Sequence, residues 1–390
     1  MVPKVAGSSP VIHPSNFARV AELADALDLG SSVLGRGGSS PPSRTIPTPV
    51  MSESRYSRQE RLAQIGPDGQ HAIGAATVAV IGLGALGSVG ADLLARAGIG
   101  KLLLLDRDVV ETSNLQRQVL YTEADATAVR PKAEAAAKRL ATVNSAIELV
   151  PLPVDLTAAN ITELLADVDL ILDGTDNFAT RYLLNDYAVA HGKPYVYAGV
   201  VSTHGMLGTI VPEGPCLRCT WPQPPDASAT PTCRSAGVLG PAVAVIAGWA
   251  CAESLKIIAG AGATEIQAGF RYLDVWTGQM QFIHAAKDEA CPCCAIGDYS
   301  WLLGQHGTIG AQVVCSGDAV QIPGSGKTVD LLAVSTKLAG TVENLQSSSR
   351  FLRFTAQGLD VLLFQDGRAL VRGTSEIARA RAVVAETVGA

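Results

Sequence analysis

The sequence lacks an excess of basic residues and any long apolar run. Its 390 residues include 30 Lys and Arg against 36 Asp and Glu, a formal net charge of −6 that is spread along the chain. This balance predicts no basic face, so we expect no nucleic-acid partner. No uninterrupted apolar stretch approaches the roughly 20 residues that a membrane-spanning helix requires, so we expect no membrane partner.

The sequence also lacks a recognisable secretory signal, although it contains 8 Cys residues. Secreted proteins use cysteines mainly in disulfides, whereas paired cysteines in a reducing compartment more often bind metal. We therefore expect a cytoplasmic protein with free thiols or thiolate–metal sites.

Residues 1–50 differ in composition from the rest of the chain. They are rich in Ser, Pro and Gly, and the segment 20–45 resembles the translation of a transfer-RNA gene. Met51 opens a more ordinary N-terminus, so we interpret 1–50 as a mis-annotated start, with a disordered tail as the alternative. Acidic residues in the helical pattern around 16–29 disfavour a transit peptide. The segment carries no predicted chemistry in any of these cases.

Beyond Thr77, short apolar runs alternate with amphipathic patterns, which predicts an α/β fold. We expect a Rossmann-like mixed sheet with helices on both faces. Segment 204–211 is expected to be an antiparallel edge strand, and 270–285 a hairpin. The apolar helix at 243–258 is predicted to be buried or to lie at a subunit interface. The other main strands are expected at 77–82, 101–106, 147–154, 168–173 and 194–200, and the other helices at 88–97, 130–141, 161–165 and 177–190.

The residues after Gly297 form a separate predicted unit. Two stretches of strand pattern alternate with two helical patterns, which predicts a small α+β module. The expected organisation is therefore an N-terminal extension at 1–50, a main domain at 51–296 and a small α+β domain at 297–390. No internal repeat is evident.

A glycine-rich turn follows the strand at 77–82. Gly82, Gly84 and Gly87 allow a tight turn, close approach of a phosphate and close packing of the next helix, whose N-terminal amides attract anions. Asp106 ends the following strand, where a carboxylate meets ribose hydroxyls. This pattern alone favours NAD or FAD.

Further polar residues change that interpretation toward ATP. Asn114 and Arg117 lie in a polar run, and Lys132 heads a helix; we expect them to converge on Asp106. A triphosphate under attack requires such cations, whereas a dinucleotide does not. The alternative for Arg117 and Lys132 is a solvated helix face. Asp176 follows a central strand, so it is predicted to hold Mg²⁺, the alternative being an N-cap for the next helix.

Two Cys-x-x-Cys pairs predict a metal site. Cys216, Cys219, Cys291 and Cys294 suit a tetrahedral Zn²⁺–thiolate site in which no position stays open, so the zinc is expected to be structural. The alternative is four buried free cysteines. Cys293 offers a second possible ligand, but Cys294 completes the spacing.

The remaining cysteines are predicted to have other roles. Cys233 lies in a Pro-rich loop ahead of a helix N-terminus expected at 237–241, a location that lowers a thiol pKa and exposes it. The alternative for Cys233 is a loop cysteine without function. Cys251 and Cys315 are expected to be core residues.

With these motifs together, the chain resembles the ThiF/MoeB/HesA family, the bacterial relatives of ubiquitin-activating enzymes. The resemblance covers about 55–295 and rests on RYSRQ, GLGALG, LLDRD, SNLQRQ, RPK, GTDN, PCLRC, the cysteine before AGVLGP, and CPCC. It implies a sulfur carrier protein adenylyltransferase that uses ATP and Mg²⁺. The substrate would be the C-terminal glycine of a small ubiquitin-fold carrier ending in Gly-Gly, activated for thiamine or molybdopterin synthesis.

The resemblance also implies roles for individual residues. Asp176 would bind Mg²⁺. Arg58 would reach the γ-phosphate of the neighbouring subunit's ATP, which implies a homodimer. Cys233 would join the carrier or assist sulfur transfer, with a cysteine desulfurase or sulfurtransferase as a further partner. The residues implied to bind ATP are Gly84, Asp106, Asn114, Arg117 and Lys132.

The chain departs from the family pattern at Ala85, where a glycine is usual. Alanine fits there provided that its backbone keeps a negative φ. No rhodanese-like extension follows, so the C-terminal module is not expected to supply persulfide sulfur; carrier docking is one hypothesis for it. Two alternatives for the whole chain are an NAD-dependent oxidoreductase and a non-catalytic family member that binds a carrier.

Overall fold

The computed structural model describes residues 54–225, 233–262, 265–306, 311–313, 318–324, 328–348 and 350–389. They belong to one compact unit, Ser54–Ala390. The predictions for residues 1–50 and for Cys315 lie outside the described residues, as does the side chain of Cys233.

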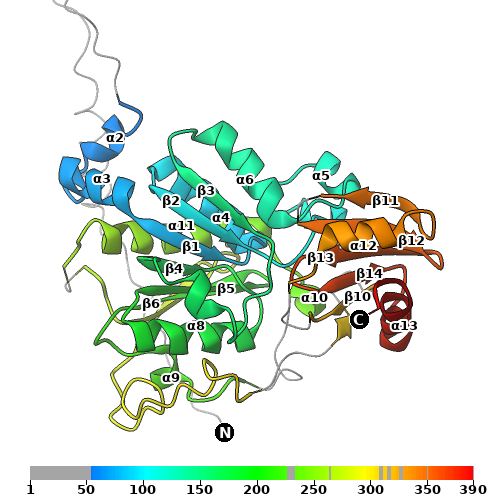
Figure 1. Ribbon diagram of the computed structural model, residues 1–390. Helices are drawn as coiled ribbons and strands as arrows, with labels where there is room; N and C mark the ends of the chain where they lie inside the picture. The colour runs from blue at the N-terminus through cyan, green and yellow to red at the C-terminus, as the bar shows by residue number, and fades with distance from the viewer. Residues whose placement is uncertain are drawn as a thin grey trace, which may run out of the picture. The chain divides into compact units, whose positions relative to one another are not determined.

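The central element is an eight-stranded mixed sheet in the order β3-β2-β1-β4-β5-β6-β7-β8. The five strands β3, β2, β1, β4 and β5 run parallel to one another, and the pairs β5–β6, β6–β7 and β7–β8 are antiparallel (Figure 1). The mixed sheet confirms the predicted fold class. Its strands are β1 (Thr77–Ile81), β2 (Lys101–Leu105), β3 (Glu148–Leu152), β4 (Leu170–Asp173), β5 (Tyr195–Val201), β6 (His204–Ile210), β7 (Gly269–Asp274) and β8 (Gln279–His284).

The prediction of an edge strand at 204–211 is wrong. β6 lies between β5 and β7, and β8 forms the edge instead. The reason is long-range: the β7–β8 hairpin follows β6 only after the long helix α11 (Gly240–Ile258), and then pairs with the side of β6 left open by β5.

Helices cover both faces of the sheet, as predicted. Alternate residues of β1 point to opposite faces: Val78 and Val80 join one apolar core, and Ala79 and Ile81 join another. The first core contains residues of α4 (Ala85–Ala97), α6 (Lys132–Val143) and α11. The second contains residues of α7 (Ile161–Leu164), α8 (Phe178–His191) and α9 (Leu217–Thr220). Figure 1 shows α6 and α8 on opposite sides of the strands.

Helix α11 is unusually apolar. Among the described residues it is the one helix with the length and composition of a membrane span, although Glu253 and Lys256 interrupt its apolar run. Its Val243, Ile246, Ala247 and Ala250 are nevertheless buried in the first core. Packing against α4, β5 and β6 explains the apolar composition of this helix.

A second sheet of six antiparallel strands, in the order β11-β12-β13-β14-β10-β9, follows in the C-terminal region. Helices α12 (Leu331–Leu338) and α13 (Ile377–Val388) pack on it, which confirms an α+β module. The boundary at 296/297 stays a prediction, because both sheets lie in one compact unit. The strands are β9 (Gln312–Val313), β10 (Ala319–Ile322), β11 (Glu343–Ser347), β12 (Phe351–Ala356), β13 (Leu359–Phe364) and β14 (Ala369–Arg372).

Candidate functional site

The glycine turn brings β1 and α4 into close contact. Gly82 has a φ of +79°, which favours glycine. A Cβ on Gly87 would lie 1.8 Å from the carbonyl oxygen of Gly82, so no other residue fits there without moving the turn. Gly84 is the N-cap of α4, and Ala85 is the first helical residue with a negative φ, as its substitution for glycine requires. The amides of this helix N-terminus are placed to bind an anion.

Asp106 is joined directly to this turn. It follows β2, and its Oδ2 accepts a hydrogen bond of 2.6 Å from the amide of Leu83, while Oδ1 accepts one of 2.7 Å from Asp108. Burial raises the pKa of Asp106, and the nearby charge of Lys132 opposes that rise. The predicted proximity of Asp106 to the glycine turn is thus present in the structure.

Lys132, which is buried, forms an ion pair with the half-exposed Asp108. Its Nζ is 3.1 Å from Oδ2 of Asp108, and its amide donates to the carbonyl oxygen of the same residue at 2.9 Å. Burial opposes the charge of Lys132, but the carboxylates of Asp108 and Asp106 raise its pKa. Because Lys132 is only 6% exposed, the alternative of a solvated helix face does not hold for it. Sequence reasoning missed Asp108, although it is the second acid of the quoted motif LLDRD.

Asp176 lies at the same edge of the sheet, in the turn after β4. The helix N-cap is Asn177, whose Oδ1 accepts from the amide of Thr180 at 2.9 Å, so the alternative role of Asp176 as N-cap is not the one observed. Asp176 is exposed, and its charge acts on Lys132 and Arg107. The carboxylate is therefore free of a capping role, and its charge acts on two basic groups of the site.

A buried arginine that sequence reasoning missed holds this turn. Arg181 donates through one terminal nitrogen to the carbonyl oxygens of Thr175 at 2.8 Å and Ala198 at 3.0 Å. Its Nε is 3.6 Å from Oδ2 of Asp173, the last residue of β4. The signal available in the sequence was an acid ending a strand, followed by an arginine in the next helix.

Three further residues are predicted to bind ATP, and for two of them the structure shows hydrogen bonds within their own segments. Arg117 donates to the carbonyl oxygen of Ser113 at 2.9 Å, within its own loop. Asn114 is buried, and its Oδ1 accepts from the amide of Glu111 at 3.1 Å, in the capping box of η1 (Thr112–Asn114). Arg58 is exposed on α2 (Ser57–Glu60). Their expected roles stay predictions.

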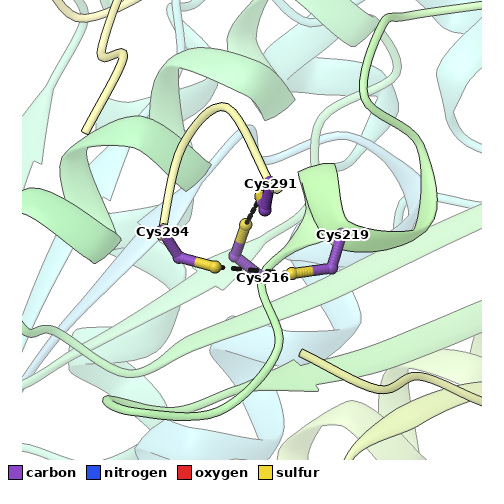
Figure 2. Close-up of side chains that lie close together, drawn as sticks. All are labelled: Cys216, Cys219, Cys291 and Cys294. Atoms are coloured by element: carbon purple, nitrogen blue, oxygen red, sulfur yellow. Dashed lines mark hydrogen bonds between the residues drawn. The ribbon is translucent and has the colours of Figure 1, made fainter. Parts of the chain in front are cut away.

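The four predicted metal ligands converge (Figure 2). The Sγ atoms of Cys216, Cys219, Cys291 and Cys294 lie within 4.8 Å of one another. The Cys216–Cys291 sulfurs are 3.6 Å apart and the Cys219–Cys294 sulfurs 3.4 Å, too far for a disulfide. A tetrahedral Zn²⁺ with bonds of about 2.3 Å places its sulfurs about 3.8 Å apart, so the donor set fits the metal.

Cys293 lies beside this cluster as a buried fifth cysteine. It accepts a hydrogen bond from Nδ2 of Asn185 at 3.4 Å. Its hydrogen bond with Cys216 is the largest effect lowering the pKa of Cys216, to about 4, and it raises the pKa of Cys293 itself. Cys294, and not Cys293, is one of the four cysteines whose sulfurs lie within 4.8 Å of one another, which favours Cys294 as the ligand. Cys251 is buried in the core as expected, 3% exposed.

A buried arginine joins the two cysteine loops to each other and to α8. Arg218, between the first two cysteines, is 3.2 Å from Oδ1 of Asp186 and donates to the carbonyl oxygen of Asp298 at 2.8 Å. Asp298 follows the second cysteine pair closely. Sequence reasoning missed this contact, for which the only signal was a charged residue inside a Cys-x-x-Cys loop.

The loop cysteine Cys233 begins a short helix, α10 (Cys233–Ala236). The expectation placed a helix N-terminus at 237–241, and α11 does begin there, at Gly240. Cys233 therefore lies at the start of its own helix as well as ahead of the next one.

Comparisons with known proteins agree with this geometry. The model of the ThiF family matches residues 56–293. A sulfur carrier protein ThiS adenylyltransferase from Bacillus subtilis (strain 168) is 40% identical over 339 residues, which cover 86% of this chain and 99% of that protein. A sulfur carrier protein adenylyltransferase from Thermus thermophilus is 40% identical over 247 residues, 62% of this chain and 90% of that protein.

The Bacillus relative also extends into the C-terminal region. The family match ends at residue 293, so an alignment of 339 residues has to include residues beyond it. Among solved structures, MccB from E. coli with ATP shares the fold at a TM-score of 0.55 and 22% identity, over 62% of this chain and 75% of that chain.

Proposed function

The chain belongs to the ThiF family, and from this we propose that it adenylates the C-terminal carboxylate of a small sulfur carrier protein. The observation that carries the proposal is the cluster of Asp106, Asp108, Lys132 and Asp176 beside the N-terminus of α4. This cluster combines a site for ribose, a cation for phosphates and a carboxylate for a metal ion. The similarity to sulfur carrier adenylyltransferases from Bacillus and Thermus supports the carrier as substrate.

The reaction is a displacement at the α-phosphate of ATP. A C-terminal carboxylate is ionised at pH 7, so it attacks without a general base, and the bond from the α-phosphate to the pyrophosphate leaving group breaks. The products are a carrier acyl-adenylate and pyrophosphate. The chain contributes position and charge. The α4 amides and Lys132 would face the phosphates. The carboxylate of Asp106, which here accepts a hydrogen bond from the amide of Leu83, would accept hydrogen bonds from the ribose hydroxyls instead.

Two metal ions belong to the proposal. Asp176 would hold Mg²⁺, which neutralises phosphate charge when bound. The four cysteines would hold Zn²⁺ in a closed tetrahedral site with a structural role, because all of its positions are taken by sulfur.

The proposal also includes a homodimer in the cytoplasm. Arg58 of one subunit would reach the ATP of the other, which suits its exposed location on α2. Arg117 would turn from Ser113 toward the phosphates when ATP binds. Cys233 would take part in the later sulfur step, with a cysteine desulfurase or sulfurtransferase as donor, and the thiocarboxylate product would serve thiamine or molybdopterin synthesis.

The decisive experiment is carrier-dependent exchange of labelled pyrophosphate into ATP. We expect exchange with a ThiS-like or MoaD-like carrier and none with the same carrier lacking its terminal glycine. Measuring which nucleotide binds distinguishes the proposal from an NAD-dependent oxidoreductase. Tight binding of NADH without binding of ATP would overturn the proposal. Binding of both ATP and carrier without exchange would favour the non-catalytic alternative.

A further inference from the structure

We propose that the C-terminal sheet braces the nucleotide site, with Arg368 as the positioning residue that holds the segment carrying Asp108. The inference rests on the proposed function, because it concerns the same ATP site. It assigns a task to the six-stranded sheet, which contains none of the residues predicted to touch ATP or metal.

Arg368 makes its main contacts outside its own sheet. It lies at the turn between β13 and β14 and is 2% exposed. One terminal nitrogen donates to the carbonyl oxygen of Arg107, and the other donates to that of Pro153 at 3.0 Å. These carbonyls belong to the segments that follow β2 and β3. One guanidinium therefore ties together the ends of two strands of the main sheet.

The side chain of Arg368 also contacts its own hairpin. The guanidinium carbon lies 4.0 Å from the ring centroid of Phe364, and Nε is 3.3 Å from Oδ2 of Asp366. The amide of Phe364 donates to the carbonyl oxygen of Arg368 at 2.8 Å. The side chain is thus held on one side by its own hairpin, so it presents its two outer nitrogens in a fixed orientation.

An apolar contact flanks the polar one. Val109 and Val129, from the segments on either side of the site, share a buried cluster with Leu362, Phe364 and other residues of the second sheet. Val109 also forms an isolated bridge with Pro131, the residue before Lys132. The second sheet therefore contacts both of the segments that carry the Asp108–Lys132 ion pair.

The site depends on this placement because Arg368 holds the carbonyl oxygen of Arg107, which links Asp106 to Asp108, in addition to the hydrogen bond from the amide of Asp108 to Asp106. Arg107 and Asp108 come directly after Asp106, and the carbonyl oxygen of Asp108 accepts from Lys132 at 2.9 Å. Loss of Arg368 leaves the carbonyls of Arg107 and Pro153 without this donor and lets the segment move. A shift of the segment alters the distance from Asp108 to Lys132. It thereby displaces the Lys132 ammonium group that the proposed function places at the phosphates.

The experiment compares ATP binding by Arg368→Ala and Arg368→Lys with a control, Arg353→Ala. Arg353 lies on β12 of the same sheet, and its ion pair with Asp360, at 2.9 Å, stays within the sheet. Dissociation constants are measured with a fluorescent ATP analogue and no carrier, at a temperature where circular dichroism shows every variant folded. Lysine keeps the positive charge but lacks the second terminal nitrogen, so it cannot bind both carbonyl oxygens. Arg368→Lys therefore tests the inference even if Arg368→Ala does not fold.

We expect ATP binding about tenfold weaker in Arg368→Lys and changed by less than about twofold in Arg353→Ala. In a double-mutant cycle, Asp108→Asn should add little to the loss caused by Arg368→Lys. Unchanged ATP binding by folded Arg368 variants, or fully additive losses in the cycle, would overturn the inference while leaving the proposed function intact. A wild-type protein that does not bind ATP would overturn both.

Discussion

The cysteine cluster and the nucleotide site differ in how far each is assembled by the chain alone. Two short loops bring the four sulfurs within 4.8 Å of one another. The nucleotide site draws on segments after β1, β2 and β4 and on the start of α6, and it leaves Arg117 bonded to its own loop at Ser113. The first is complete in one chain, whereas by our proposal the second gathers its last residues only with ATP bound and a second subunit present.

The two sites also differ in electrostatics. At the nucleotide site, Lys132 and Arg107 already balance the carboxylate of Asp108, whose pKa they lower against the effect of burial. The cysteine cluster contains four potential thiolates, and Arg218, between the first two cysteines, is already paired with the carboxylate of Asp186. Metal binding is therefore expected to be coupled to folding at the cluster, and nucleotide binding is not.

The largest predicted effect is loss of the metal. Cys216→Ser and Cys291→Ser should each lose zinc and become less stable at the same time. The free energy of unfolding should fall by roughly several kcal/mol, a large fraction of the 5–15 kcal/mol that is typical of a folded protein. Zinc content by elemental analysis and unfolding by urea measure the two effects. Cys293→Ser is the matched control, because it should keep one zinc per chain. A metal-free wild type with the same unfolding midpoint as the zinc form would contradict the prediction.

The second predicted effect is large on activity and small on stability. Asp176→Ala should abolish pyrophosphate exchange, a loss of about 3 to 4 kcal/mol or more of transition-state stabilisation. Its melting temperature should stay near that of the wild type, because Asp176 is exposed and Asn177 provides the helix cap. Asn177→Ala is the control with the reverse pattern. It should lower the melting temperature, because the helix cap is lost, and reduce exchange less than Asp176→Ala does. Normal exchange by Asp176→Ala would remove this residue from the magnesium site.

The sequence predicted those parts of the two sites that depend on local spacing. The cysteine pairs, the glycine turn and Asp106 all occur within short motifs, whose geometry follows from a few consecutive residues. The β6 edge prediction failed because its second neighbour, β7, comes from far along the chain.

Buried charges were the other part that sequence reasoning could not supply. Arg181, Arg218 and Arg368 are at most 7% exposed, yet an arginine in a sequence resembles any other surface residue. Each becomes identifiable only when folding places a carboxylate or backbone carbonyl oxygens around its guanidinium. Several of their partners, such as Ala198, Asp186 and Pro153, lie in other segments of the chain, so the local signals alone do not predict these contacts.

A third prediction tests whether the nucleotide site is shared between subunits. Arg58→Ala should lower exchange by about a hundredfold, because a cation at the phosphates would be missing. Co-expression with Asp176→Ala chains should restore part of the activity, since one site of each mixed dimer then has both residues intact. Differently tagged chains allow purification of the mixed dimer. Absence of recovery in that dimer would place Arg58 in its own chain's site or outside the reaction.

The smallest predicted effect on adenylation is that of Cys233→Ala. Displacement at the α-phosphate requires charge and position but no thiol, so exchange should stay within about twofold of the wild type. The later sulfur step does require a nucleophilic sulfur, and a cysteine at the start of a helix is suited to form a thiolate. Thiocarboxylate formation, followed by the mass of the carrier, should therefore fall while exchange persists. Cys251→Ala serves as the matched control, because Cys251 is buried in the core, where burial raises its thiol pKa to about 12. If Cys233→Ala lost exchange as severely as Asp176→Ala, the thiol would belong to the adenylation step, and the separation of the two steps would be wrong.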